Sequence, residues 1–182
     1  VFYDAESWAL IGYDALAIGN HEFDQGPDTF ADVINAYKAT TGGTNAPFLS
    51  ANIDVSLEPQ LAALAATGDI AKSTIVERNG QTYGIVGATT PNLPFISSPG
   101  AVIVDQNVVG AVQTEIDKVQ LGLDGVAGTA DDVNKVILIS HLQGVEEDQT
   151  LVAQLSGVDI AIAGGGDNLL ANPGNELIPG DD

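Results

Sequence analysis

The sequence predicts an α/β fold built around a mainly parallel sheet. Three short apolar runs, at 15–18, 136–140 and 158–163, have the length and composition of buried strands. The run at 136–140 is continuously apolar, which is typical of a central parallel strand covered on both faces. Segments with apolar residues at spacings of three and four lie between these runs and predict helices. Alternation of this kind favours a layered α/β domain.

The other elements follow in chain order. Helices are predicted at 1–11, 27–38, 57–67, 107–121 and 148–155, and further strands at 47–51, 73–77, 82–88 and 102–104. Asn79-Gly80 lies between two of these strands, and an Asn-Gly pair between apolar runs is a strong signal for a hairpin. Residues 92–100 break the pattern and predict an irregular loop.

The length and composition indicate one globular domain that spans residues 1–182. A chain of 182 residues with 45% hydrophobic residues can bury a sizeable core. The sequence contains no cysteine, which excludes disulfides and thiolate metal sites. No apolar run reaches the length of a transmembrane helix, so we expect no membrane span.

The charge is strongly acidic, since 25 Asp and Glu residues against 5 Lys and Arg residues give a net charge of -20. Such a chain repels nucleic acid and anionic membranes, and we expect no nucleic acid duplex among its partners. The simpler interpretation is an acidic surface that keeps a secreted protein soluble. The alternative is a surface that gathers metal ions, whose charge would reverse the field met by an anionic substrate.

An acidic loop at 122–134 interrupts the alternation of helix and strand and is typical of an insertion. Its acidic residues are Asp124, Asp131 and Asp132, and several glycines separate them. Carboxylates offer the oxygen ligands that Ca²⁺ prefers, although the full acidic ladder of an EF-hand is missing. The loop therefore predicts either a calcium site or a solvated turn.

Polar side chains suited to metal chemistry follow two of the predicted strands. Asn20 and His21 come after the run at 15–18, and His141 ends the run at 136–140. An amide oxygen is a hard ligand, and an imidazole binds metal, holds a proton or donates to a phosphate oxygen. The chain has only these two histidines, and in parallel sheets ligands bind at the carboxyl ends of strands. We therefore predict one shared site, against the alternative of polar turns without chemistry.

Five blocks of sequence, in the same order over most of the chain, resemble one enzyme family. The blocks are 12–24 (GYDALAIGNHEFD), 50–53 (SANI), 84–91 (GIVGATTP), 139–142 (ISHL) and 157–164 (GVDIAIAG). Together they resemble the calcineurin-like metallophosphoesterases, in their 5′-nucleotidase branch. The resemblance implies a metallophosphoesterase-like α/β sandwich with mainly parallel central strands, and the N-terminal catalytic domain of such an enzyme.

The resemblance also implies divalent-metal-dependent hydrolysis of phosphate monoesters, with a small phosphorylated substrate such as a nucleotide. Two metal ions (Mn, Zn, Mg or Fe) would lie about 3.5–4 Å apart and activate a water. Carried over by position, Asn20 and His141 bind one of these metals. His21 contacts the phosphate or protonates the leaving oxygen, and Asp24 or Glu22 orients its ring.

Three further positions belong to the predicted site. Asn52 comes after the predicted strand at 47–51 and is interpreted as a loop cap that could also line the substrate site. Asp167 stands where the family has a metal-binding histidine, and its carboxylate suits Mn²⁺, Mg²⁺ or Ca²⁺ better than Zn²⁺. Gly165 stands at the other histidine of the family's GHSH block and offers only backbone. One ligand is therefore lost unless another side chain or a water replaces it.

The sequence contains no D-x-H, and no G-D precedes the block at 12–24, where the family carries both motifs. We expect them upstream of Val1, so that the sheet is incomplete at its N-terminal side. Two alternative functions stay open: a weakened or inactive phosphoesterase-fold binding module, and a calcium-dependent extracellular acidic protein. The resemblance also implies a secreted, periplasmic or cell-surface location, and a C-terminal nucleotide-binding domain in the same precursor.

Overall fold

The computed structural model describes residues 2–43 and 45–166. The helices are α1 (Tyr3–Ile11), the 3-10 helix η1 (His21–Phe23), α2 (Pro27–Thr41), α3 (Pro59–Ala66), α4 (Leu93–Ile96), α5 (Val108–Gln120) and α6 (Val145–Val152). The strands are β1 (Leu16–Ala17), β2 (Phe48–Leu49), β3 (Ile53–Asp54), β4 (Ile70–Ala71), β5 (Ser73–Arg78), β6 (Gln81–Thr89), β7 (Ile103–Val104), β8 (Val136–His141) and β9 (Ile160–Ala163).

The strands form two main sheets whose members are mostly parallel. Strands β1, β2 and β4 make a short parallel sheet, and β5, β6, β8 and β9 make a longer one in that order. Within the longer sheet only the β5–β6 hairpin is antiparallel. Asn79 and Gly80 form the predicted turn between these two strands, and both have a positive φ. A small antiparallel pair, β3 and β7, lies beside them. The predicted α/β class with mainly parallel strands is confirmed.

The two main sheets come into backbone contact at Gly87, which has no side chain to hold them apart. Gly87, in β6, accepts a hydrogen bond from Ala51 N–H at 2.8 Å and donates one to Lys72 O at 3.3 Å. A Cβ atom built on Gly87 would overlap the backbone carbonyl of Leu49, in β2. Because backbone from both sheets is in direct contact, only glycine permits this approach.

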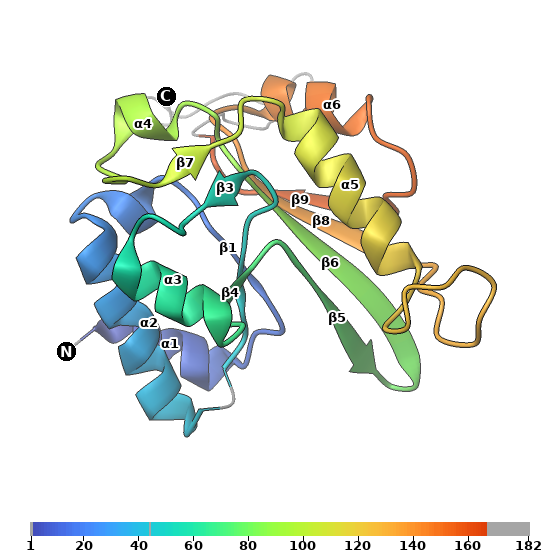
Figure 1. Cartoon of the computed structure of the whole chain (residues 1–182), viewed down its shortest axis with the longest axis horizontal. Coiled ribbons are helices and arrows are strands. Elements are labelled where there is room, and N and C mark those ends of the chain that lie inside the picture. The colour runs from blue at the N-terminus through green and yellow to red at the C-terminus, as the bar shows by residue number, and fades with distance from the viewer. Residues whose placement is uncertain (1, 44, 167–182) are drawn as a thin grey trace, which may run out of the picture.

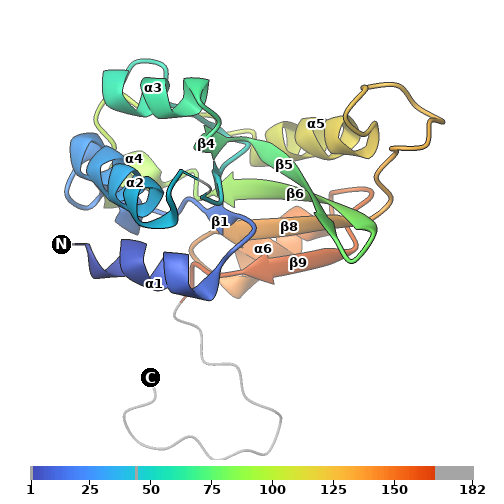
Figure 2. The same cartoon turned by 90° about the horizontal axis from the view of Figure 1, so that it is seen from below.

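The helices cover the sheets in two groups, each with its own core (Figures 1 and 2). Helices α1, α2 and α3 gather around the short sheet, where the rings of Trp8, Phe30, Tyr37 and Phe48 meet edge to face. Helices α5 and α6 cover the longer sheet, and α5 buries Val112 and Ile116 completely. In α2 and α5 the apolar spacing seen in the sequence marks the buried positions, whereas α1 buries only Ala5 and leaves Leu10 and Ile11 exposed.

Three elements differ from the sequence-based expectation. Helix α4 lies within 92–100, which was predicted to be an irregular loop, and a proline in its first turn suits the start of a helix. Strand β9 was predicted to be buried, but Ile160 is 55% and Ile162 is 57% exposed. Within the described residues β9 pairs only with β8 and is therefore an edge strand. An apolar composition signals a tendency to be buried, but it does not say which partner covers the strand.

Helix α6 begins at Val145, three residues before the predicted start. Gly144 precedes it in an extended conformation, and Glu146, Glu147 and Asp148 occupy the first turn. Negative side chains are favourable there, because the amino end of a helix carries a partial positive charge. The acidic run is thus a start signal rather than a loop, which explains the shift.

Candidate functional site

The structure brings together the two strand ends that carry the predicted ligands. His141 ends β8, where its register partner in β6 is Thr89, and Asn20 follows β1 across a short turn. Asn20 Oδ1 lies 3.0 Å from His141 Nε2, although 121 residues separate the two in sequence. Gln143 Nε2 also donates to Asn20 Oδ1, at 3.2 Å, and so fixes the orientation of the amide. Gln143 carried no signal in the sequence, because its role depends on this long-range contact.

Buried hydroxyl groups behind this site hold three strand ends in place. Thr89 Oγ1 donates to Ile18 O at 2.6 Å and lies 2.7 Å from Ser50 Oγ. The side chain of Asn52 donates to Thr89 O and accepts from Thr89 N–H, both at 2.9 Å. Thr89, Ser50 and Asn52 are all buried. Each buried polar side-chain atom here has a partner, so the hydrogen bonds offset the cost of desolvation and fix the geometry of the strand ends.

The imidazole of His141 lies flat against a glycine. A Cβ atom on Gly19 would come within 2.6 Å of His141 Nδ1, so any side chain at this position would displace the ring. Burial of the ring lowers the pKa of His141, while Glu22 and Asp148 oppose the shift and His21 adds to it. A lowered pKa favours the neutral imidazole, which is the form that binds a metal.

Replacing Gly19 with alanine is expected to push His141 away from Asn20 and to weaken metal binding about tenfold, as losses around metal ligands commonly do. Isothermal titration of the intact protein with Mn²⁺ measures this. Gly164→Ala is the matched control, because a Cβ there would meet only Ser140 O at an ordinary 3.7 Å. Equal affinity in Gly19→Ala and the wild type would contradict the assigned role of Gly19.

The second histidine forms an ion pair with a carboxylate on the same loop. His21 Nδ1 lies 2.7 Å from Asp24 Oδ2, and the two side chains are 72% and 45% exposed. Hydrogen bonds from His21 and then Ser97 hold the pKa of the Asp24 carboxyl below its usual value. Glu22 instead accepts a hydrogen bond from Gly19 N–H at 2.6 Å. Of the two predicted orienting groups, Asp24 is therefore the one in contact with the His21 ring.

Asn20 Oδ1 and His141 Nε2 share a hydrogen bond in this structure, and their separation is also compatible with two ligands of one divalent cation. Adjacent ligands of an octahedral ion with bonds of about 2.1 Å lie about 3.0 Å apart. This is the distance between Asn20 Oδ1 and His141 Nε2. The ring of His21 is 6.3 Å from that of His141, centre to centre, and its Nδ1 is directed to Asp24. His21 thus stands beside the Asn20–His141 pair, with its Nδ1 held by Asp24.

The other two positions of the predicted metal site are Gly165 and Asp167. At Gly165 the backbone leaves no room for a side chain, because a Cβ atom would overlap the carbonyl oxygen of Leu142. Asp167 lies outside the described residues. Within residues 2–43 and 45–166, no group of three or more His, Cys, Asp or Glu side chains could hold a metal ion. The described residues therefore do not form a metal site of three or more such side chains by themselves.

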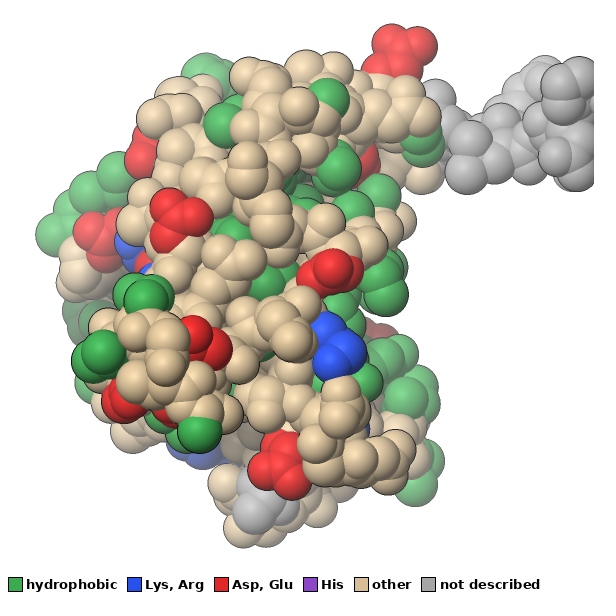
Figure 3. Space-filling model, turned by 90° about the vertical axis from the view of Figure 1, so that its right-hand side faces the viewer, with side chains coloured by type: hydrophobic (Ala, Val, Ile, Leu, Met, Phe, Trp, Pro, Cys, Tyr) green, Lys and Arg blue, Asp and Glu red, His purple; other side chains and the backbone are tan. Residues whose placement is uncertain are grey.

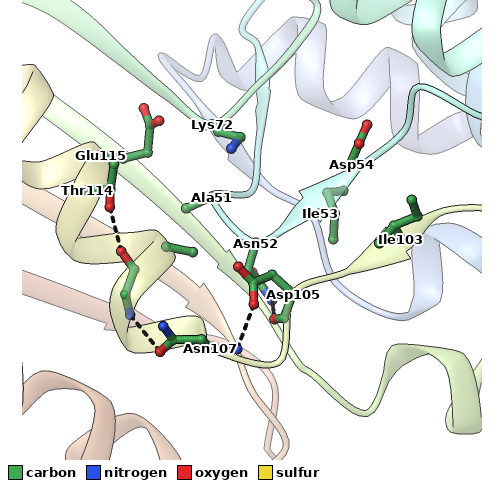
Figure 4. A pocket seen from close by; sticks show the side chains of 12 residues that line it. Ala51, Asn52, Ile53, Asp54, Lys72, Ile103, Asp105, Asn107, Thr114 and Glu115 are labelled. Carbon is green, nitrogen blue, oxygen red and sulfur yellow. Dashed lines mark hydrogen bonds between the residues drawn. The ribbon is translucent and has the colours of Figure 1, made fainter.

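Asn52 lies one strand away from these groups, at the wall of a separate cavity. The cavity has a volume of about 500 Å³ and opens between β3, β7 and α5. Figure 4 shows Asn52 beside Asp105 and Asn107, with Lys72 on the opposite side. The Asn52 amide is already bonded to Thr89 and, at 3.4 Å, to Asp105 O. Asn52 thus contacts both Asp105, which lines the cavity, and Thr89, which lies at the strand end beside His141.

The acidic loop folds back on itself. Asp131 Oδ2 accepts hydrogen bonds from Leu123 N–H and Asp124 N–H, and Asp132 Oδ2 accepts one from Gly128 N–H. These donors hold the pKa of the Asp131 carboxyl below its usual value, with Thr129 contributing most. The carboxylate oxygens that were candidates for calcium are thus directed at the loop's own donors.

The acidic side chains are dispersed on the face of the molecule that Figure 3 shows. On the face in Figure 3, Asp and Glu side chains lie scattered among uncharged ones. Scattered charge suits solubility better than it suits a localised cation site. Among the described residues, no helix is both long and apolar enough to cross a membrane.

Comparisons with known proteins identify relatives over most of the chain. The 5′-nucleotidase of Rattus norvegicus is 33% identical over 174 residues, which are 93% of this chain and 27% of the relative. The trifunctional nucleotide phosphoesterase protein of Bacillus subtilis is 29% identical over 180 residues, with 88% of this chain and 12% of the relative covered. The chain therefore spans about a quarter, or less, of the length of these curated relatives. No family model matches the chain.

The solved structures agree with the sequence comparison. The crystal structure of a 5′-nucleotidase precursor from Thermus thermophilus superimposes with a TM-score of 0.75 at 34% identity, covering 97% of this chain and 31% of that one. The structure of the NAD nucleotidase of Haemophilus influenzae superimposes with a TM-score of 0.70 at 24% identity. The superposition covers 93% of this chain and 30% of the nucleotidase chain, and at this identity it supports the fold alone.

Proposed function

We propose that this chain, which is homologous to the N-terminal domain of the 5′-nucleotidases, takes part in divalent-metal-dependent hydrolysis of nucleotide monophosphates. The observation that supports this most is the meeting of Asn20, His141 and the His21–Asp24 pair at one edge of the sheets. Oxygen and imidazole ligands beside a carboxylate-supported histidine are the groups that metal-assisted phosphate ester hydrolysis requires.

In this proposal Asn20 and His141 hold one divalent ion. A bound divalent ion activates a water as the nucleophile and stabilises the charge that develops on the phosphate oxygens. The orientation of the Asn20 amide comes from Gln143, and that of the His141 ring comes from Gly19. The chain thus fixes both ligands before the ion arrives, which lowers the cost of binding it.

His21 would act on the leaving group. Its Nδ1 faces Asp24, so Nε2 is the nitrogen that can face a substrate. As the P–O bond breaks, Nε2–H gives its proton to the leaving oxygen and the ring becomes neutral. Before that step Asp24 stabilises the positive ring, because a carboxylate within hydrogen-bonding distance favours the charged form.

Metal content distinguishes this function from the alternatives. In the intact protein, His141→Ala is expected to lower the amount of Mn²⁺ or Zn²⁺ retained after desalting, measured by elemental analysis. His21→Ala is the matched control and should retain the wild-type amount, because His21 is not a ligand here. Full retention by His141→Ala would contradict the assignment of His141.

The alternative of a weakened binding module is favoured by Gly165, where the fold excludes a side chain. If the intact wild-type protein retains no transition metal and hydrolyses no nucleotide, that alternative replaces the enzyme. Stabilisation by Ca²⁺ alone, persisting in His141→Ala, would instead favour the calcium-dependent acidic protein.

The proposal also includes the location of the protein and a further domain of its precursor. We infer a secreted, periplasmic or cell-surface location and a C-terminal domain of the same precursor that supplies the nucleotide base pocket. The acidic composition is compatible with such a location. Fractionation that finds the mature protein in the cytoplasm would contradict the location.

A further inference from the structure

We propose that Ser97 is a positioning residue for His21 and acts through the carboxylate of Asp24; the proposal rests on the function proposed above. Ser97 Oγ donates a hydrogen bond to Asp24 Oδ1 at 2.9 Å, and Asp24 Oδ2 lies 2.7 Å from His21 Nδ1. The two oxygens of one carboxylate thus have two different partners. Ser97 reaches this loop from a segment 73 residues further along the chain.

The His21–Asp24 pair needs such an external contact because it is exposed. The two side chains are 72% and 45% exposed, and exposed ion pairs of this kind are weak on their own. The backbone bond from Asp24 N–H to His21 O fixes the position of the Asp24 backbone but not the rotation of its carboxylate. A hydroxyl bound to the second oxygen restricts that rotation and keeps Oδ2 directed at the ring.

Ser97 is itself anchored to the strand end that carries His141. Its N–H donates to Leu93 O at 3.2 Å, and Leu93 is completely buried in α4. At the start of the same segment, Thr90 is completely buried and its N–H donates to His141 O at 2.9 Å. The segment from Thr90 to Ser97 therefore connects the His141 strand end to the loop of Asp24. Through it, the positions of the metal ligand and the proton donor are set together.

The consequence is specific to proton transfer. With Asp24 held in place, His21 keeps its Nδ1–H and directs Nε2 towards the leaving oxygen. Without the Ser97 hydroxyl, the carboxylate rotates more freely and the ring loses its fixed orientation. Substrates whose leaving group needs a proton should therefore suffer, whereas substrates with an acidic leaving group should not.

The test compares Ser97→Ala with two matched variants in the intact, metal-loaded protein. For a nucleoside monophosphate, Ser97→Ala should lower kcat about tenfold and leave KM nearly unchanged, since misorientation affects the transition state more than binding. For p-nitrophenyl phosphate, whose leaving group is acidic, kcat should hardly change.

Ser97→Thr keeps the hydroxyl and should restore turnover. Ser98→Ala removes the neighbouring, exposed hydroxyl and should have no effect. Equal losses for both substrates, or no loss, would overturn the proposal.

A second measurement does not depend on catalysis. ¹⁵N NMR of the histidine-labelled protein, with the His21 signals assigned from His21→Gln and recorded at a pH at which the ring is neutral, reports which ring nitrogen carries the remaining proton. Ser97→Ala should shift the His21 nitrogens towards a mixture of tautomers, and Ser97→Thr should not. If the wild type hydrolyses no phosphate ester, the proposed function fails while this result still decides the role of Ser97. Identical His21 spectra in Ser97→Ala and the wild type would refute that role.

Discussion

Replacing Gly87 with alanine is expected to lower the free energy of unfolding by about 3 kcal/mol, the upper end of the usual cost of overpacking. The new methyl group would overlap the backbone of Leu49, which cannot rotate away as a side chain could. The hydrogen bonds that join the sheets at Ala51 and Lys72 would lengthen as the backbones separate. For a domain of this size the melting temperature should fall by about 10 °C. Urea denaturation and thermal melting measure both quantities.

Gly164→Ala provides the comparison for Gly87→Ala. Gly164 follows β9, and a Cβ there would meet only Ser140 O, at 3.7 Å. The substitution should therefore change stability by less than about 1 kcal/mol, as surface substitutions usually do. If both variants unfold at the same urea concentration, the close approach at Gly87 is not what holds the two sheets together.

Replacing His21 with glutamine is expected to lower kcat for a nucleoside monophosphate by about 10²- to 10⁴-fold, the usual contribution of general acid catalysis. Glutamine preserves much of the size and polarity of the ring but transfers no proton. The loss should largely disappear with p-nitrophenyl phosphate, whose leaving group departs without protonation. Steady-state kinetics on the intact protein with both substrates measure this difference.

Two results would argue against the assignment of His21. Full turnover of the nucleoside monophosphate by His21→Gln would remove it from catalysis. An equal loss on both substrates would indicate that it binds the phosphate rather than protonating the leaving oxygen. Asp24→Asn should follow His21→Gln in direction, since it removes the charge that stabilises the positive ring.

Local signals predicted much of the fold. The Asn79-Gly80 pair predicted the β5–β6 hairpin because both positions have positive φ, which few other residue pairs adopt readily. The apolar run before His141 predicted β8, although its residues alternate between buried and half-buried instead of being fully covered on both faces. Both features depend on neighbouring residues, so a single sequence is enough to recognise them.

Contacts between distant segments could not be predicted in this way. Ser97 and Gln143 have no local pattern that distinguishes them from other polar loop residues, yet each contacts a predicted site residue. The exposure of β9 likewise depends on what lies beside it, and its alternating Ile and Ala residues are typical of a covered strand. The candidate ligands came from residue chemistry at strand ends, whereas the groups that orient them came from the folded arrangement.

The separation of Asn20 and His141 by 121 residues also has a kinetic consequence. The two ligands meet only after β1, β6 and β8 have aligned, and contacts of such high sequence separation form slowly during folding. A growing polypeptide therefore has no paired ligands until most of this region has been synthesised. A cation that recognises the pair binds the native state but not the nascent chain, so it stabilises the folded domain by mass action. If the pair binds a cation as proposed, metal supply and completion of folding are thermodynamically linked.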